Sequence, residues 1–228
     1  MSTLLVALSH PDDEIGCAGT IAAHVASGHR VVLLWLSRGE MTEAFGDLPD
    51  DEVADRRMAH GAEAADILGC EHRFMTFPDT RIEAGPDAAR EVAAVVAEVR
   101  PDAVVTWGGA WRRGMRHPDH QAAGRIVRDA VTLARIGKVV RPLDPHRADV
   151  ALFTLRGEHS TLPEAAVDVT EQRDTIMALQ RHYYDAVGWP EASFLEDRLR
   201  RAGARHGVEL AELFDAWETP PGLGRSLI

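Results

Sequence analysis

Two short segments of the sequence carry side chains that can hold a metal ion. SHPDDE at 9–14 places an imidazole and three carboxylates directly after an apolar run, and HPDH at 117–120 repeats the His-Pro-Asp pattern. His10, Asp13 and His120 together offer two nitrogen ligands and one carboxylate, a set that suits a catalytic zinc ion with one position left for water. His10 and Asp13 lie three positions apart in the first segment, and His117 and His120 lie three apart in the second. Each pair can therefore point to one side. The spacing predicts a site for one metal ion.

Histidines outside these segments are expected to be structural. A lone histidine is more often a hydrogen-bonded residue than a ligand. The two clusters are different, because a buried carboxylate without a cationic or histidine partner is costly. We therefore expect structural roles for the isolated histidines, which are His24, His29, His72, His146, His182 and His206.

Glu14 and two nearby glycines allow more than one interpretation. Glu14 is either a carboxylate favoured by the dipole at a helix amino terminus or a hydrogen-bond partner of a ligand histidine, and the sequence leaves both open. Gly16 and Gly19 lack the spacing of a G-x-G-x-x-G phosphate loop, so close packing of a helix on the sheet is the expected reason for them.

The elements that must position these residues alternate along the chain. Apolar runs typical of strands lie at 3–9, 30–37, 72–77, 102–107 and 148–155. Segments with helical spacing lie between them, at 14–28, 51–69 and 87–100. Continuous apolar strands separated by helices predict an α/β fold: one Rossmann-like domain with a mostly parallel sheet and helices on both faces.

Strand order decides whether the two metal-binding segments meet. In a doubly wound sheet of order 3-2-1-4-5, the first and fourth strands are neighbours, and ligands bind beyond their carboxyl ends. SHPDDE follows the first strand and HPDH lies just after the fourth, so the two should face each other across one crevice.

The whole chain, residues 1–228, is expected to form one domain. Residues 1–155 would supply the Rossmann-like core, and 156–228 would pack on the same core. Within this second part we expect a connection up to about 169, then helical stretches near 170–184 and 192–217.

Composition limits the function. Asp and Glu number 36 against 25 Lys and Arg, a formal charge of -11, which disfavours nucleic acid as a partner. The apolar runs are far shorter than the roughly 20 residues of a membrane span, and no signal-peptide pattern begins the sequence, so a cytoplasmic location is expected. Cys17 and Cys70 form no C-x-x-C pair and are expected in the core.

The motifs resemble those of a known family. SHPDDE after the first strand and HPDH after the fourth are similar to the PIG-L, or LmbE-like, zinc-dependent N-deacetylases, and the resemblance continues through LSRGE, RRMAHGAEAADILG, FPD and LAELFDAW. This family acts mainly on N-acetylglucosamine groups in glycolipid anchors, thiol-cofactor precursors, chitobiose units and some antibiotics. The resemblance implies an amide hydrolase that releases acetate and a free amine from an N-acetylated amino sugar.

The resemblance also implies roles for the residues of the first segment. His10, Asp13 and His120 would hold one zinc ion per chain, with Asp12 as the general base. The chemistry agrees, because a carboxylate beside a metal ligand can take a proton from water on the metal, whose pKa falls to about 7.

Two residues of the second segment would stabilise the reaction. His117 would be the electrophilic histidine, since the oxyanion formed on the amide carbon needs positive charge. A protonated His117 would supply that charge, with Asp119 orienting and stabilising its cationic form. The sequence does not decide whether Asp12 or His117 protonates the leaving amine.

A loop and two further positions could contact the substrate. The stretch WGGAWRRGMRH at 107–117 has two tryptophans for packing on a sugar and three arginines for an anionic group, although a solvated basic loop fits equally well. The resemblance implies two further substrate contacts, Arg57 and Asp79, the acid of FPD. The expected substrate-binding residues are Arg57, Asp79, Trp111, Arg113 and Arg116.

Departures from the family pattern leave the substrate open. His60 stands where the family often has a glutamate, and Met115 where some members have a tyrosine. An amidase for a larger thiol conjugate, a Rossmann-like nucleotide-binding module and a metal-stabilised scaffold are the alternatives. A homo-oligomer is also possible, since related small members often form multimers.

Overall fold

One sheet brings the predicted site segments together. The computed structural model describes residues 1–108, 117–157, 159–188, 192–217 and 222–228. In these ranges eight strands form one sheet of order β3-β2-β1-β4-β5-β7-β6-β8. The strands are β1 Thr3–Leu8, β2 Arg30–Trp35, β3 Glu71–Phe74, β4 Ala103–Trp107, β5 Ala151–Leu155, β6 Glu164–Asp168, β7 Ala211–Ala216 and β8 Gly222–Gly224.

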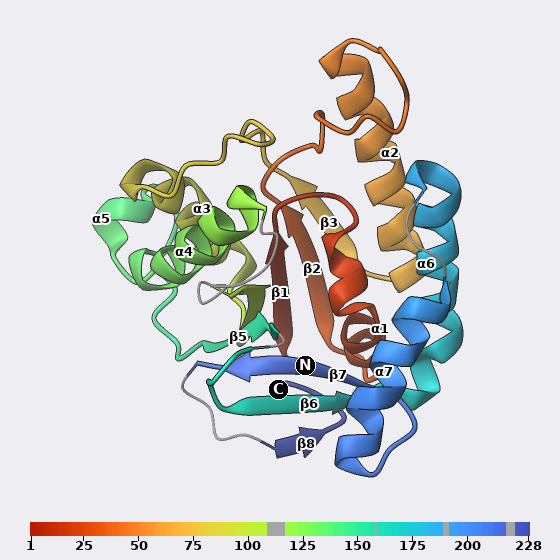
Figure 1. The fold of residues 1–228 in the computed structure, drawn as a ribbon. Coiled ribbons are helices and arrows are strands. Elements are labelled where there is room, and N and C mark those ends of the chain that lie inside the picture. The colour runs from red at the N-terminus through yellow and green to blue at the C-terminus, as the bar shows by residue number, and fades with distance from the viewer. Residues whose placement is uncertain (109–116, 158, 189–191, 218–221) are drawn as a thin grey trace.

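The predicted strand order 3-2-1-4-5 is confirmed. β1 pairs in parallel with both β2 and β4, and β3 and β5 extend the sheet in parallel on either side. Beyond β5 the direction changes, because β7 is antiparallel to both β5 and β6. The carboxyl ends of β1 and β4 therefore lie side by side, and the loop after β1 meets the start of the helix after β4 (Figure 1).

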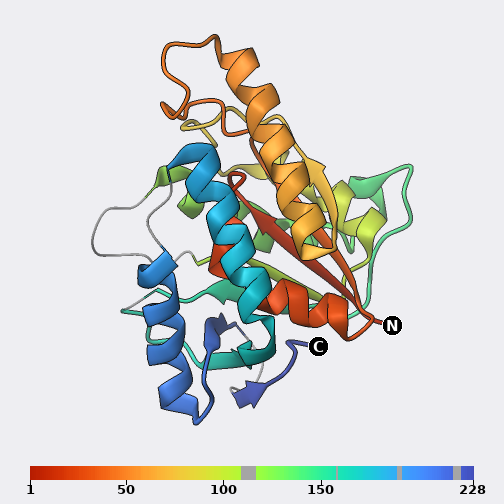
Figure 2. The same cartoon turned by 90° about the vertical axis from the view of Figure 1, so that its right-hand side faces the viewer.

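Helices cover both faces of the sheet, as predicted for this fold class (Figures 1 and 2). One face carries α1 Ala18–Ala26, α2 Asp50–Leu68, α6 Arg173–Val187 and α7 Ala192–His206. The other carries α3 Pro86–Val99, α4 Pro118–Leu133 and the short α5 Gly137–Val140. Two short 3-10 helices, η1 Asp13–Gly16 and η2 Thr170–Gln172, precede α1 and α6.

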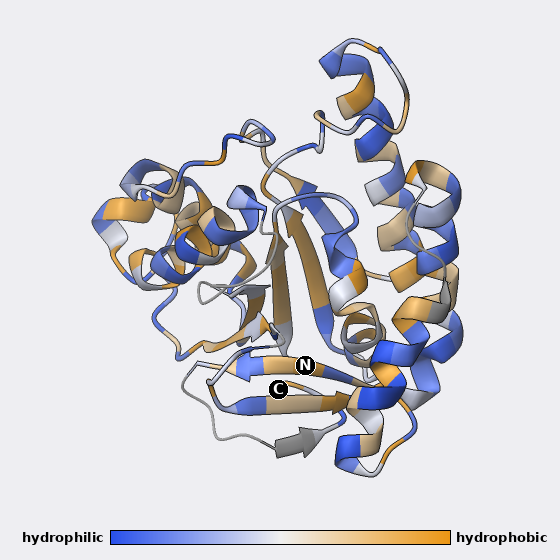
Figure 3. Cartoon of the chain, viewed as in Figure 1, coloured by the Kyte–Doolittle hydropathy of each residue, from blue (hydrophilic) through white to orange (hydrophobic). Residues whose placement is uncertain are grey.

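The apolar central strands explain this layering. Residues 4–8 of β1 are fully buried, with alternate side chains entering the two core clusters on opposite faces of the sheet. Figure 3 shows the apolar strands at the centre and polar residues on the outer sides of the helices. A strand buried on both faces cannot alternate polar and apolar residues, which is why its sequence reads as a continuous apolar run.

The C-terminal part differs from the sequence prediction in two places. The connection expected at 156–169 contains β6, whose EAAVD sequence is rich in alanine, a residue depleted in strands. The helix expected over 192–217 ends at His206, because Gly207 has a φ of 74° and stops it, and β7 follows. The strand was missed because it carries a buried charge at Glu212.

Glu212 of β7 caps the amino terminus of α1. Its carboxylate accepts hydrogen bonds of 2.9 and 2.8 Å from the backbone N–H groups of Gly19 and Thr20, in the first turn of α1. A Cβ on Gly19 would lie 2.6 Å from Cβ of Val169, which confirms that close packing requires this glycine. The amino terminus of α1, where a Rossmann-like module would bind phosphate, is thus filled by a protein carboxylate.

A second glycine sets the approach of α4 to the sheet. A Cβ on Gly124 would lie 2.2 Å from the carbonyl oxygen of Trp107, so only glycine allows α4 to contact the end of β4 at this point. This contact fixes the first turn of α4, which carries the HPDH motif. Among the described residues, no helix is long and apolar enough to span a membrane.

We predict that Gly124→Ala destabilises the protein by about 1–3 kcal/mol, because a backbone carbonyl cannot move aside for the added methyl group. Urea denaturation measures this effect. Gly137→Ala is the matched control, since a Cβ there meets only side-chain atoms of Pro145 at 3.7 Å and beyond. Equal stability of the two variants would show that α4 can shift away from β4 without loss.

Candidate active site

The carboxylate of Asp13 joins the two halves of the site. Its Oδ2 accepts hydrogen bonds from the backbone N–H groups of Ser9 and His10 at 3.0 and 2.9 Å and from Nε1 of Trp107 at 3.0 Å. Its Oδ1 lies 3.2 Å from Nε2 of His120. Burial opposes ionisation of Asp13, but the charge and hydrogen bond of His120 outweigh it and hold the pKa well below its ordinary value.

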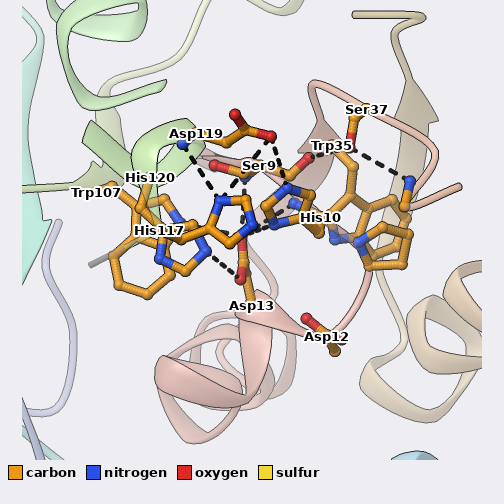
Figure 4. Close-up of polar contacts among 12 residues, drawn as sticks. Ser9, His10, Asp12, Asp13, Trp35, Ser37, Trp107, His117, Asp119 and His120 are labelled. Atoms are coloured by element: carbon orange, nitrogen blue, oxygen red, sulfur yellow. Dashed lines mark hydrogen bonds and ion pairs between the residues drawn. The ribbon is translucent and has the colours of Figure 1, made fainter. Parts of the chain in front are cut away.

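His120 is held by an aromatic stack. Its ring lies 3.8 Å from the ring of Trp107, centroid to centroid, with only 8° between the planes. Trp107 ends β4 and also donates to Asp13, so one indole orients two of the predicted metal ligands (Figure 4). Sequence reasoning placed Trp107 in a sugar-binding loop and missed this role, since nothing local to β4 indicates a contact with the loop after β1.

His10 uses one ring nitrogen for protein carboxylates. Its Nε2 lies 3.1 Å from Oδ2 of Asp119 and 3.0 Å from Oδ1 of Asp79. Asp119 also accepts from the backbone N–H groups of Thr80 and Ile82, at 2.7 and 3.2 Å. Burial lowers the pKa of His10, but the contacts with Asp119 and Asp79 outweigh it and raise the pKa to about 10. A proton on Nε2 leaves Nδ1, 3.7 Å from Asp13, as the nitrogen that can bind a metal.

His117 has a different environment from the one the sequence suggested. Its Nδ1 accepts a hydrogen bond of 3.3 Å from the backbone N–H of Asp119, at the amino terminus of α4. The Asp119 carboxylate lies 4.0 Å away and contacts His10 more closely. Burial, together with the neighbouring histidines, lowers the pKa of His117. This geometry favours a neutral ring with its proton on Nε2.

The donor set fits a metal ion. Ligand atoms of His10, His117 and His120 lie within 4.8 Å of one another, and Asp13 lies between His10 and His120. Two ligands of a tetrahedral ion with bonds of about 2 Å are themselves about 3.3 Å apart, close to the 3.2 Å between Asp13 and His120. The other oxygen of Asp13 and Nε2 of His10 already contact protein groups, and the ring of His120 stacks on Trp107, which matches a site of this type.

A second group of possible ligands shares His10. Atoms of His10, Asp79, His117 and Asp119 also lie within 4.8 Å of one another. In this group the carboxylates of Asp79 and Asp119 face the Nε2 of His10 that they hydrogen-bond, which is the arrangement of carboxylates that orient a ligand histidine. Asp13 belongs to neither group, and His117 accompanies His10 and His120 in the first one. We keep His10, Asp13 and His120 as our prediction for the metal ligands, because Asp13 lies 3.2 Å from Nε2 of His120 and 3.7 Å from Nδ1 of His10.

Asp12 lies beside these residues in a strained backbone conformation. Its φ is 121°, which residues other than glycine rarely adopt. Arg57 of α2 donates from Nη2 to Oδ2 of Asp12 at 2.7 Å and to the carbonyl oxygen of Pro11. Burial raises the pKa of the Asp12 carboxyl, and the charge of Arg57 opposes that rise. Arg57 is buried, and within the described ranges its Nε and Nη1 have no hydrogen-bond partner.

Glu14 holds the backbone of Asp12 in place. The carboxylate is fully buried and accepts from the Asp12 backbone N–H and from Nε1 of Trp35, each at 3.0 Å, and from the hydroxyl of Tyr183. The first interpretation from the sequence fits, since Glu14 lies in the first turn of η1 and accepts from the backbone N–H of Asp12, the residue that precedes this helix. Among the described residues, Glu14 forms no hydrogen bond with a predicted ligand histidine; it joins the loop after β1 to β2 and α6. Burial raises its pKa to about 7, although the Tyr183 hydrogen bond opposes the change.

A pocket of about 400 Å³ opens onto this cluster. The predicted metal ligands, Asp12, His117, Asp79 and Arg57 all line it. Both Asp79 oxygens already accept from protein groups, His10 and the Met41 N–H, so a sugar hydroxyl would have to share them. Three expected substrate-binding residues lie outside the described ranges: Trp111, Arg113 and Arg116.

Other histidines have structural contacts. The ring nitrogens of His24, His146 and His182 bond to backbone carbonyl oxygens, and His206 contacts Glu164. Within the described ranges, the possible metal-binding groups contain none of the isolated histidines. Of the two cysteines, Cys17 is buried as expected, whereas Cys70 is only half-buried.

Comparison with known proteins gives a family match. The family model described as PIG-L, GlcNAc-PI de-N-acetylase, matches residues 5–131. Diacetylchitobiose deacetylase from Thermococcus kodakarensis is 30% identical over 82% of this chain and 68% of its own length. A 1D-myo-inositol 2-acetamido-2-deoxy-alpha-D-glucopyranoside deacetylase from Kineococcus radiotolerans is 35% identical over 58% of this chain, but this match spans only 45% of that enzyme.

Solved structures share the fold. A conserved protein from Thermus thermophilus has a TM-score of 0.80 and 32% identity, with 96% of each chain covered. A 4-carboxy-2-hydroxymuconate hydratase from Pseudomonas putida also has a TM-score of 0.80, with 97% of this chain and 98% of that chain covered. Its identity of 21% shows likeness of fold alone. The fold thus carries more than one chemistry, and the side chains of the site must decide between them.

We predict that Trp107→Phe weakens metal binding about 10–100-fold, because phenylalanine keeps part of the stack on His120 but cannot donate to Asp13. Titration of the metal-free protein with zinc, followed by calorimetry, measures the change. Trp217→Phe is the control, since this tryptophan is exposed and stacks on Arg128. Unchanged affinity in Trp107→Phe would show that Asp13 needs no support from β4.

Glu14 should make folding stability depend on pH. A carboxyl whose pKa rises from 4.5 to about 7 on folding stabilises the folded state fully below pH 4.5, and this contribution is lost as the pH rises through 7. Relative to Glu14→Gln, the wild type should therefore lose stability between about pH 4.5 and 7. Urea denaturation across this range measures it, with Glu91→Gln, an exposed position on α3, as the control. A pH-independent difference would contradict the prediction.

Proposed function

We propose that this chain, which belongs to the PIG-L family, hydrolyses the N-acetyl amide of an amino-sugar compound and releases acetate and a free amine. Its relatives are named as deacetylases of diacetylchitobiose and of an inositol-linked acetamido sugar. One observation supports the proposal above all others. The histidine and aspartate clusters of two distant segments converge on one pocket, with Asp12 held beside the predicted metal ligands.

We propose zinc as the ion, one per chain, held by His10, Asp13 and His120. Nitrogen and carboxylate ligands in a three-residue set are typical of catalytic zinc sites. When bound, such an ion supplies Lewis acidity toward the amide carbonyl and toward water. The protein supplies the geometry, because each ligand is oriented by a neighbour. His10 is oriented by Asp119 and Asp79. Asp13 and His120 are both oriented by Trp107.

Asp12 is placed to act as the general base. It lines the pocket next to Asp13, and its raised pKa brings it closer to neutral pH, where a carboxylate base is more effective. Arg57 fixes its orientation and keeps the charged form accessible. The proton that Asp12 takes from the attacking water balances the proton that the departing amine must receive.

His117 acts on the carbonyl oxygen of the substrate as a neutral donor. With Nδ1 accepting from the Asp119 backbone N–H, Nε2 carries the proton and can donate to the oxyanion that forms as water adds. A neighbouring cation would lower the pKa of His117 further, so the neutral form is the one that persists in the loaded enzyme. The role expected for Asp119 changes accordingly, from stabilising a cationic His117 to orienting His10.

The first test is a substrate panel. Zinc-loaded protein should release acetate and free amine from N-acetylglucosamine glycosides and from diacetylchitobiose, and chelation should abolish the activity until zinc returns. A thiol conjugate with a larger acyl group should be a poorer substrate. If only the thiol conjugate is cleaved, the protein is an amidase of that second type. Absence of any cleavage by the loaded protein would refute the proposed reaction.

The second test separates metal binding from proton transfer. Asp12→Asn should keep about one zinc per chain and lose at least 100-fold in kcat, the usual scale for a lost general base. His120→Ala should lose zinc. Metal analysis and steady-state kinetics measure both, and Asp144→Asn, remote from the pocket lining, is the control. Loss of zinc from Asp12→Asn with retention by His120→Ala would reverse the two assignments.

A further inference from the structure

Two helices hold Asp12, the proposed general base, from different sides. Arg57 of α2 binds its carboxylate. Glu14, which also accepts from Tyr183 of α6, binds its backbone N–H. α2 and α6 pack against each other on one face of the sheet (Figure 2). A change in the separation of these two helices therefore reaches Asp12 through both of its supports.

His60 of α2 and His182 of α6 lie at the contact between the helices. Their rings meet edge to face with centroids 5.8 Å apart, and Nε2 of His182 donates to the carbonyl oxygen of His60 at 2.9 Å. His60 follows Arg57 by one helical turn, and His182 directly precedes Tyr183. The histidine pair thus joins the two supports of the proposed base.

The ring of His60 packs between the helices and leaves Arg57 without an ion pair inside α2. An acidic side chain one turn after an arginine on a helix can pair with it. In the described part of the chain, Nδ1 of His60 and both Nε and Nη1 of Arg57 are instead buried without a hydrogen-bond partner. The His60 ring lies 5.7 Å from the ring of Phe45, centroid to centroid. His60 therefore contributes a ring surface to this contact rather than a hydrogen bond from Nδ1.

The surroundings of His60 oppose a positive charge on its ring. The charged and titratable groups that act on it are Arg56, Arg57 and Glu63 of its own helix and His182 of α6. Burial, together with the charges of Arg57 and His182, lowers the pKa of His60 below its ordinary value of 6.5. Glu63 acts in the other direction, but it is exposed and lies 3.6 Å from Nδ1 of His182. The closed contact thus favours the neutral form of His60.

The sheet limits how α2 can respond to a charge at this position. A Cβ on Gly61, the residue after His60, would lie 2.8 Å from the ring of Phe74 and 3.1 Å from that of Trp35. α2 therefore already touches the sheet here and cannot move closer to it, because protein interiors are closely packed. Repulsion between a charged His60 and its cationic neighbours is relieved by separation of α2 from α6, which takes Arg57 with it.

We propose that His60 is a positioning residue for Asp12: its neutral ring keeps α2 against α6, and protonation of that ring loosens the hold of Arg57 on Asp12. The inference rests on the proposed function, because it takes Asp12 as the general base. His60 is not among the described residues that line the pocket. Turnover would thus fall at acid pH through a group that contacts neither the substrate nor the predicted metal ligands.

The first experiment compares His60→Lys with His60→Met, two side chains of similar length of which only one carries a charge. With zinc bound and at about pH 8, His60→Lys should have a kcat about 10-fold or more below that of His60→Met, because a small displacement of a catalytic group is costly. Zinc content should be the same in both. Ala59→Lys places the same charge at an exposed neighbouring position and should keep the wild-type kcat. Equal kcat in the two His60 variants would overturn the proposal.

The pH dependence of the wild type gives a second test, which decides the question if His60→Lys does not fold. Between about pH 8 and 5, the kcat of the wild type should fall about 3–10-fold more than that of His60→Met, since only the wild type gains a proton at this position. Zinc analysis and urea denaturation at each pH show that the proteins are loaded and folded.

A purely structural role would give a different pattern. Because the folded state binds the His60 proton more weakly than the unfolded state does, the wild type should lose stability relative to His60→Met as the pH falls below 6.5. A ring that only fills space between the helices would produce this loss of stability and leave kcat unaffected. Parallel pH profiles of kcat in the two folded proteins would therefore overturn the positioning role.

Failure of the proposed reaction can be recognised separately. If the loaded wild type cleaves no substrate of the panel, the proposed function fails, and hydrogen exchange of the Asp12 amide then tests the positioning directly. This amide, which donates to Glu14, should exchange about 3–10-fold faster in His60→Lys than in His60→Met at the same pH. Equal exchange in the two proteins would overturn the role of His60.

Discussion

The buried carboxylate of Asp13 is the interaction on which the site depends. One oxygen accepts three N–H groups, two from the backbone after β1 and one from the indole that ends β4. A buried charge without partners would be strongly destabilising, so these bonds force the ends of two strands into a fixed relation. The other oxygen faces His120. Folding and the proposed metal binding therefore both depend on the Asp13 carboxylate.

The strain at Asp12 follows from this constraint. The loop must turn sharply between His10 and Asp13, both of which face the cluster, and Asp12, the second of the two residues between them, takes a positive φ. The conformation persists because Glu14 holds the backbone N–H and Arg57 holds the side chain. Strained residues concentrate at functional sites, where contacts with the surrounding structure hold the unfavourable backbone conformation in place. Here those contacts come from η1 and α2, with Trp35 and Tyr183 supporting Glu14 from β2 and α6.

The sequence predicted the fold class, the order of the first five strands and the residues that meet beyond them, because long apolar runs and dense polar motifs are local signals. The sequence-based prediction failed where the role of a residue depends on a partner far away in the sequence. β7 was read as helix since Glu212 faces inward to cap α1, almost two hundred residues away in sequence. The tasks of Trp107 and Glu14 were missed for the same reason: each is defined by a partner from another strand or helix.

The residues that line the pocket come from two separate parts of the sequence. Every residue assigned to the chemistry lies before position 121, within the family match at 5–131, whereas Gln180, Phe194, Leu195 and Arg198 come from the last quarter of the chain. Mutations at the lining positions of α7 can thus accumulate without disturbing the reactive groups, whereas α6 also carries Tyr183, which supports Glu14. Sequence divergence in the C-terminal part can thus change the substrate while the N-terminal part keeps the same reaction. Specificity and chemistry are encoded in separate segments of the chain.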